Sequence, residues 1–310
     1  MNASENDDPE ITLAAGEWTA TVAPLGASLR GATWRNAPVV TGYHGRANKV
    51  GGQGDVLIPF PGRIAGGAYT FGGARHQMEK SDKEGPNAIH GFLRSRVWNV
   101  LHQGANVAAF TTRFEGAEGY PFPLDADVAY ALDPDKGLAC TFAVRNVGDG
   151  PAPVAAGFHP YFTALSETIN DDALTVPFAS SLEFDANLIP TGRVLPVAGT
   201  PLDFRAPRPI GETRFNTCYA GPTLDADGQV RVCLQSNQRT VTVSFAADPF
   251  GYVVLYSGDP LPTTHARRAL AIEPMTCGSD AFNNPEWGLR VLEPGQELRG
   301  TWSVLAEEPA

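Results

Sequence analysis

The sequence predicts an all-β protein that forms one large antiparallel β-sandwich. Apolar and polar residues alternate with a period of two in many runs of four to eight residues, which is typical of half-buried strands. These runs are rich in β-branched and aromatic residues, and the 33 glycines and 26 prolines of the chain punctuate them. Convincing amphipathic helices of ten or more residues are absent from the sequence. This many short strands favours a sandwich with long loops between some of them.

The alternating runs follow one another along the chain from residue 11 onward. Trp18, Ala20 and Val22, for example, alternate with Thr19 and Thr21. The predicted strands lie at 18–22, 107–111, 127–132, 138–144, 230–234, 241–245, 252–256, 270–272 and 301–305. Short helical turns are predicted at 166–172 and 280–286, and the proline-rich stretch 190–209 is interpreted as connecting loops.

The sequence predicts a single domain. At 310 residues with 43% hydrophobic content, it can bury a large core. It contains no internal repeat, no low-complexity linker and no shift in composition that would mark a domain boundary. We therefore expect a single β-sandwich domain at residues 11–306. Residues 1–10, which are polar and acidic, are expected to be disordered.

Charge and cysteine content restrict the class of protein. The formal net charge of −11 argues against a broad nucleic-acid surface or binding to an anionic membrane, and it is compatible with a small neutral ligand. The N-terminus lacks the basic and apolar regions of a signal peptide, and no apolar run approaches the ~20 residues that span a bilayer. We therefore expect a cytoplasmic protein. Its widely spaced cysteines predict reduced, buried thiols: Cys140, Cys218, Cys233 and Cys277.

Two stretches put a proton-transfer side chain among apolar residues. Glu273 follows the apolar run 270–272 and precedes Pro274. Burial there would raise its pKa and make it a stronger base than a surface glutamate. His159, within Gly-Phe-His-Pro-Tyr-Phe at 157–162, also precedes a proline, which restricts its backbone. A structural salt bridge between Glu273 and an arginine is an equal alternative on these residues alone.

Three further stretches combine polar side chains with glycine or proline. They contain Arg63 in Pro-Phe-Pro-Gly-Arg-Ile-Ala-Gly-Gly, His90 in Asn-Ala-Ile-His-Gly-Phe, and Asn216 in Thr-Arg-Phe-Asn-Thr-Cys-Tyr. Taken singly, each is more typical of a turn, a structural histidine or a loop than of a binding site. The chain has no Gly-x-Ser-x-Gly, P-loop or Gly-x-Gly-x-x-Gly motif, and its six histidines lack metal-binding spacing. We expect no metal and no cofactor.

Together, these stretches resemble the aldose 1-epimerase (galactose mutarotase) family. Five motifs occur in the family's order between about residues 51 and 283: those around Arg63, His90 and His159, Gly-Tyr-Pro-Phe at 119–122, and Ile-Glu-Pro-Met-Thr with Asp-Ala-Phe-Asn at 272–283. The resemblance implies the family's galactose mutarotase-like supersandwich, a large antiparallel β-sandwich. It also implies that the single domain is catalytic and acts on a sugar.

The resemblance implies a role for each matching residue. His159 matches the family's general acid and Glu273 its general base, and a nearby Glu273 carboxylate is expected to help keep His159 charged at pH 7. Arg63 and His90 match residues that hold sugar oxygens. Asn216 stands where the family has a sugar-binding aspartate, and an amide can donate as well as accept hydrogen bonds.

Two further differences from the family's sequence pattern concern residues next to Arg63 and Glu273. Gly62 stands where the family usually has asparagine, and Pro274 and Met275 stand where galactose mutarotases have Thr-Gln. These departures, with Asn216, bear on the preferred sugar and leave the reaction class unchanged. The resemblance does not predict the oligomeric state.

The implied activity is that of an aldose 1-epimerase, which interconverts the α and β anomers of a hexose by acid/base ring opening and closure. One alternative is a mutarotase for an anionic phospho- or sulfo-sugar, for which Arg30, Arg94 and Arg96 are available. Another is a non-catalytic carbohydrate-binding protein on the same fold. A glycosidase would need a second carboxylate across the bond, and only Glu273 is well placed by its motif.

Overall fold

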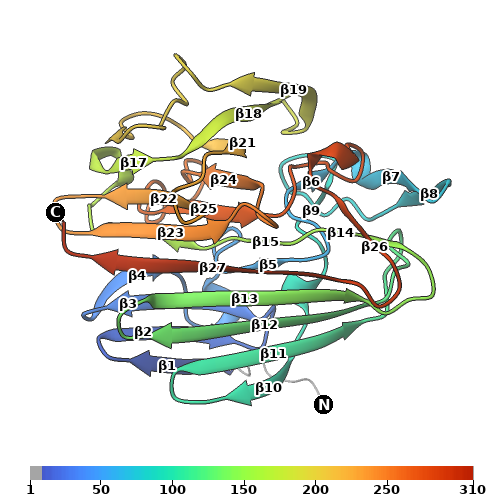
Figure 1. Cartoon of the computed structure of the whole chain (residues 1–310), viewed down its shortest axis with the longest axis horizontal. Coiled ribbons are helices and arrows are strands. Elements are labelled where there is room, and N and C mark those ends of the chain that lie inside the picture. Colours follow the sequence, from blue (N-terminus) through green and yellow to red (C-terminus); the bar gives the residue numbers. More distant parts are fainter. Residues whose placement is uncertain (1–8, 310) are drawn as a thin grey trace.

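Two large antiparallel β-sheets lie face to face and form most of the molecule (Figure 1). The structure is a computed structural model that describes residues 9–309 of the chain. One hydrophobic core contains side chains from both sheets. Within the described residues there is no α-helix, and the helical segments are short 3₁₀ turns. The predicted all-β antiparallel sandwich is therefore confirmed.

The larger sheet has twelve strands, and its middle carries the strand that contains Glu273. Its main order is β1 (Ile11–Ala15), β2 (Trp18–Ala23), β3 (Ser28–Trp34), β4 (Ala37–Thr41), β16 (Tyr161–Phe162), β25 (Leu270–Met275), β24 (Tyr252–Tyr256), β21 (Asn216–Pro222), β18 (Phe178–Phe184) and β19 (Pro190–Pro196). Off this path, β15 (Gly157–Phe158) pairs with β25 and with β5 (Val56–Leu57).

The second sheet has nine strands and supplies the opposite wall of the core. Its order is β10 (Asn99–Gln103), β11 (Val107–Phe114), β12 (Leu124–Asp133), β13 (Gly137–Asn146), β27 (Glu297–Glu307), β23 (Thr240–Ala246), β22 (Gln229–Gln235), β17 (Ala173–Thr175) and β20 (Arg208–Pro209).

Small strand pairs and 3₁₀ helices complete the architecture. The pairs are β6 (Arg63–Ile64) with β9 (Ala88–Ile89), β7 (Ala68–Phe71) with β8 (Ala74–Gln77), and β14 (Ala152–Val154) with β26 (Arg290–Leu292). The 3₁₀ helices are η1 (Arg46–Asn48), η2 (Ala65–Gly67), η3 (Leu93–Ser95), η4 (Ile169–Asp171) and η5 (Pro285–Trp287).

Aromatic packing in the core fixes the backbone on both sides of His159. The Phe158 ring lies 5.8 Å from the Trp302 ring and 5.5 Å from the Phe142 ring, between centroids. Phe162 meets the same Trp302 edge-on at 6.4 Å. Side chains alternate along an extended chain, so residues 158 and 162 point into the core while residue 159 points to the other face of the sheet.

The structure contains every predicted strand, as β2, β11, β12, β13, β22, β23, β24, β25 and β27. The interpretation of 190–209 as loops is wrong in part, because β19 and β20 lie there. Both are the last strands of their sheets, where a proline that lacks an N–H is tolerated. The loop interpretation around Asn216 is also wrong, since β21 begins at that residue. The predicted helical turns contain η4 and the start of η5.

Disorder is expected for residues 1–10, of which residues 1–8 lie outside the described part of the chain. Glu10, at the end of that segment, accepts hydrogen bonds from the Arg30 guanidinium (3.1 Å) and the Gly45 amide (3.0 Å). No helix within residues 9–309 is both long enough and apolar enough to span a membrane.

A buried arginine ties the two sheets together. Arg239 precedes β23 of the nine-stranded sheet and is only 3% exposed. Its guanidinium donates hydrogen bonds to the carbonyls of Trp34 (3.1 Å) and Pro38 (2.7 Å), which belong to the hairpin β3–β4 of the other sheet. A charged donor makes stronger hydrogen bonds than a neutral one. These bonds join the nine-stranded sheet to the end of the β3–β4 hairpin.

We expect Arg239→Ala to lower the free energy of unfolding by about 2–3 kcal/mol, because buried carbonyls lose a charged donor. The control is Arg231→Ala, which removes an exposed arginine paired with Asp225 and Asp227 and should cost less than about 1 kcal/mol. Urea denaturation of both variants measures the difference. Equal losses in the two variants would show that Arg239 does not tie the sheets.

Candidate active site

A pocket of about 510 Å³ opens beside β25. All five residues singled out from the sequence line it: Arg63, His90, His159, Asn216 and Glu273. They come from β6, the end of β9, the β15–β16 link, β21 and β25. The fold therefore brings together residues that are up to 210 positions apart, from Arg63 to Glu273.

Strand register puts His159 opposite Glu273. Gly157 pairs with Met275 through β15, and Tyr161 pairs with Ala271 through β16. Continuing this register across the link puts residue 159 opposite residue 273. The His159 backbone bonds elsewhere: its amide donates to the carbonyl of Asp55 at 3.0 Å. Residues directly opposite each other on antiparallel strands point to the same face of the sheet, so the two side chains lie next to each other.

The His159 and Glu273 side chains meet at the floor of the pocket. His159 Nε2 lies 3.4 Å from Glu273 Oε1, and the two side chains are only 8% and 2% exposed. His159 Nδ1 and Glu273 Oε2 are buried and have no hydrogen-bond partner within residues 9–309. Buried polar atoms in proteins are nearly always bonded. Two such unpaired atoms in one pocket indicate that a polar ligand completes the site.

Burial holds both side chains in their neutral forms. It lowers the pKa of His159 to about 3, with Lys49 and Arg94 adding to the effect, and it raises the pKa of Glu273 well above its usual range. The expectation that the Glu273 carboxylate keeps His159 charged is wrong, because the cost of burying charge outweighs the attraction between the two groups. With both side chains neutral, the pair holds one proton and no net charge.

His90 presents one defined ring nitrogen to the pocket. It has a left-handed backbone (φ 64°), and so does Gly91 (φ 65°), where a Cβ would lie 2.1 Å from the carbonyl oxygen of Ile58. His90 Nδ1 accepts a hydrogen bond from the Gly62 amide at 3.2 Å. The position of His90 inside the pocket, away from bulk water, lowers its pKa. The neutral ring therefore carries its proton on Nε2, which can act as a donor.

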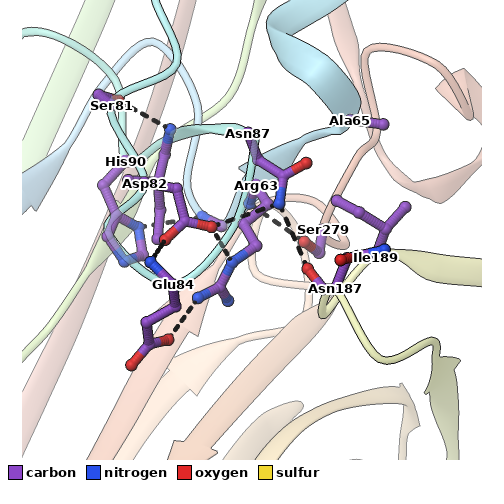
Figure 2. A network of polar contacts seen from close by, with 12 residues as sticks. Arg63, Ala65, Ser81, Asp82, Glu84, Asn87, His90, Asn187, Ile189 and Ser279 are labelled. Carbon is purple, nitrogen blue, oxygen red and sulfur yellow. Dashed lines mark hydrogen bonds and ion pairs between the residues drawn. The ribbon is translucent and has the colours of Figure 1, made fainter.

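Two carboxylates from the 81–87 loop hold Arg63 (Figure 2). Arg63 Nε donates to Asp82 Oδ2 at 2.7 Å, and Nη2 donates to Glu84 Oε2 at 2.8 Å. Asp82 is in turn bonded by the Glu84 amide at 3.0 Å and the Asn87 side chain at 3.3 Å. Arg63 Nη1 has no partner within the described residues and is available to a ligand. Asp82 and Glu84 were not predicted as site residues, because the sequence of their mixed-charge loop resembles that of any solvated turn.

A second group of charges lies in the pocket wall. Lys49 and Arg94 line the pocket, and both pair with the fully buried Asp55, Arg94 Nη1 at 3.3 Å from Asp55 Oδ2. Of the three arginines considered for an anionic ligand, only Arg94 lines the pocket. Arg96 packs over the ring of Phe114, and Arg30 is buried beside Glu10. No sequence signal links Lys49 to Asp55 or Arg94.

Asn216 and the neighbouring strand complete the wall. Asn216 is the first residue of β21 and pairs with Tyr256 of β24, and both residues line the pocket. Within residues 9–309, no group of three or more His, Cys, Asp or Glu side chains could hold a metal ion. The chemistry that the described residues offer is proton transfer by His159 and Glu273, with hydrogen-bond donors around them.

Comparison with known proteins identifies the family. The family model for aldose 1-epimerase matches residues 9–304. The chain is 30% identical to the protein YihR of Escherichia coli K12 over 297 residues, which cover 96% of this chain and 93% of that protein. It is 29% identical to the galactose mutarotase of Homo sapiens over 314 residues, which cover 92% of this chain and 88% of that protein.

Solved structures share the fold. The GalM/aldose epimerase homologue from C. elegans has a TM-score of 0.88 at 21% identity and covers 98% of this chain and 100% of its own. Galactose 1-epimerase from Lactobacillus acidophilus NCFM has a TM-score of 0.83 at 20% identity and covers 100% of this chain and 97% of its own. With the family model matching nearly the whole sequence, the chain belongs to the aldose 1-epimerase family.

Proposed function

We propose that this protein is an aldose mutarotase, which interconverts the α and β anomers of a hexose. The observation that carries the proposal is the contact between His159 and Glu273 at the floor of a pocket. A pair that holds one proton is what the reaction needs, since ring opening removes a proton from one sugar oxygen and delivers a proton to another.

In the proposed mechanism the proton first passes from Glu273 to His159. Glu273 then takes the proton of the anomeric hydroxyl O1, while His159 protonates the ring oxygen O5 and the C1–O5 bond breaks. The free aldehyde rotates about C1–C2 and recloses on its other face with the two roles reversed. The pair holds one proton before and after each interconversion of the anomers, so the reaction consumes no proton. Each positioned proton-transfer group typically contributes about 10²–10⁴-fold to the rate.

Three further residues are proposed to hold the sugar. His90 would donate from Nε2, Arg63 from Nη1, and Asn216 would accept or donate through its amide. A guanidinium fixed by two carboxylates loses little freedom when it binds a hydroxyl. The 81–87 loop therefore supports the sugar by holding Arg63 in position.

An anionic aldose is a second candidate substrate, because Lys49 and Arg94 line the pocket and share a single carboxylate. Two cations on one buried Asp55 leave one net positive charge in that wall. Asn216 lines the same pocket and, unlike an aspartate, adds no negative charge to it. A phosphate or sulfonate on the sugar would find its counter-charge there.

We expect Glu273→Gln and His159→Ala each to lower the mutarotation rate by at least ~10²-fold, because each removes one proton-transfer group. Polarimetry on freshly dissolved α-anomers measures the rate after subtraction of the spontaneous reaction. Glu167→Gln, which changes an exposed carboxylate, is the control and should match the wild type. A rate near the wild-type value in either site variant would remove that residue from the mechanism.

The activity should have a broad pH plateau. The lowered pKa of His159, about 3, means that the pair gains a second proton only as the pH falls toward 3. The raised pKa of Glu273 means that the pair keeps its one proton to a higher pH than an ordinary glutamate would allow. We therefore expect no loss of kcat/KM, which reports the free enzyme, as the pH falls through the usual histidine pKa of ~6.5, as measured by NMR exchange between anomers. A loss of activity centred near pH 6.5 would contradict a buried, neutral His159.

The two substrate classes can be separated by one variant. If the substrate is anionic, Arg94→Gln should lower kcat/KM by about tenfold or more for glucose 6-phosphate or a 6-sulfonate, because a charge-assisted hydrogen bond is lost. The same variant should change kcat/KM for glucose and galactose little. Arg96→Gln, outside the pocket, is the matched control. An equal effect on charged and neutral sugars would remove Arg94 from charge recognition.

A further inference from the structure

A third buried polar group faces the same pocket. Tyr161 is 3% exposed and lines the pocket, and its hydroxyl has no hydrogen-bond partner within residues 9–309. The other unpaired buried atoms at the pocket belong to His159 and Glu273, the two residues proposed to move protons. A buried hydroxyl without a partner is costly. Its position in the same pocket as the other two unpaired atoms indicates that all three serve one ligand.

Packing fixes the Tyr161 ring tightly. It stacks on the His159 imidazole with centroids 5.1 Å apart and an interplanar angle of 15°. The Tyr256 ring meets it edge-on at 6.4 Å. The backbone of Gly51 also lies close to the hydroxyl, because a Cβ built on Gly51 would lie 3.1 Å from the hydroxyl oxygen. The packing of the ring therefore fixes the position of the hydroxyl, without the help of a hydrogen bond.

Strand register places Tyr161 on the same face as Glu273. Tyr161 pairs with Ala271, and Ala271 and Glu273 point to the same face of β25 because side chains alternate along a strand. Burial raises the pKa of Tyr161. The hydroxyl therefore stays protonated across the physiological range and can only donate to a negatively charged oxygen.

We propose that Tyr161 is a further catalytic residue, whose hydroxyl donates a hydrogen bond to the sugar oxygen that Glu273 deprotonates. This inference rests on the proposed mutarotase function. As O1 loses its proton to Glu273 it gains negative charge, until the C1–O5 bond breaks and O1 becomes the aldehyde oxygen. A fixed donor that points at that oxygen stabilises the transition state more strongly than it stabilises the bound sugar. Tyr161 keeps its own proton throughout.

The test compares Tyr161→Phe with Tyr219→Phe. Tyr161→Phe keeps the ring that stacks on His159 and removes only the hydroxyl. Tyr219 lies in the same sheet, and its hydroxyl donates to the Leu202 carbonyl at 3.1 Å, outside the pocket. The substrate is whichever of glucose, galactose and glucose 6-phosphate the wild-type protein converts fastest, and NMR exchange between anomers gives kcat and KM.

We expect Tyr161→Phe to lower kcat by about 10²-fold, the loss typical of one donor to a developing oxyanion, with KM within about threefold of the wild type. Tyr219→Phe should leave both constants unchanged. An unchanged kcat in Tyr161→Phe, or a change confined to KM, would overturn the proposal. If the wild-type protein converts none of the sugars, the mutarotase function itself fails, and that result is distinct from failure of the Tyr161 assignment.

A stability measurement gives a second readout that needs no substrate. Because the Tyr161 hydroxyl has no partner among the described residues, Tyr161→Phe should unfold at the same urea concentration as the wild type or a higher one. Tyr219→Phe, which loses a hydrogen bond, should unfold at a lower concentration. A Tyr161→Phe variant destabilised as much as Tyr219→Phe would show that the hydroxyl has a structural partner, and would overturn the proposal.

Discussion

The site depends on how the short segment 157–162 lies against β25. Both ends of this segment pair with β25, one through Gly157 and the other through Tyr161. The residues beside His159 and Tyr161, namely Phe158 and Phe162, are buried against Trp302 of the opposite sheet. The same alternation that anchors the phenylalanines in the core turns the histidine and tyrosine toward the pocket. Core packing between the sheets thus sets the geometry of the His159–Glu273 pair.

Burial then determines the chemistry of the pair. A histidine and a glutamate in contact at a surface would form an ion pair, but here both side chains are removed from water, and the neutral forms are favoured. A neutral pair that shares one proton can pass that proton in either direction. Such symmetry suits a reversible reaction whose forward and reverse steps exchange the roles of acid and base.

The cations around the His159–Glu273 pair, unlike the pair itself, are charged and are fixed by carboxylates. Arg63 is fixed by Asp82 and Glu84, and Lys49 and Arg94 share Asp55. These side chains come from the stretch between residues 49 and 94, much of which lies in short strands, turns and 3₁₀ helices at the mouth of the pocket. The large sheets provide the floor of the pocket with the His159–Glu273 pair, and this irregular stretch provides charged residues of its walls.

The sequence by itself determined the fold class and the five candidate residues. Period-two alternation is a local property, and the motifs around Arg63, His90, His159 and Glu273 are contiguous, so both can be recognised without coordinates. Only the tertiary structure decided which other groups share the pocket. Ion pairs between separate segments join Arg94 to Asp55 and Arg63 to Asp82. The absence of a partner for the Tyr161 hydroxyl among the described residues likewise depends on how distant segments pack around it. The neutral state of the pair also follows from burial on all sides, which no local pattern of residues encodes.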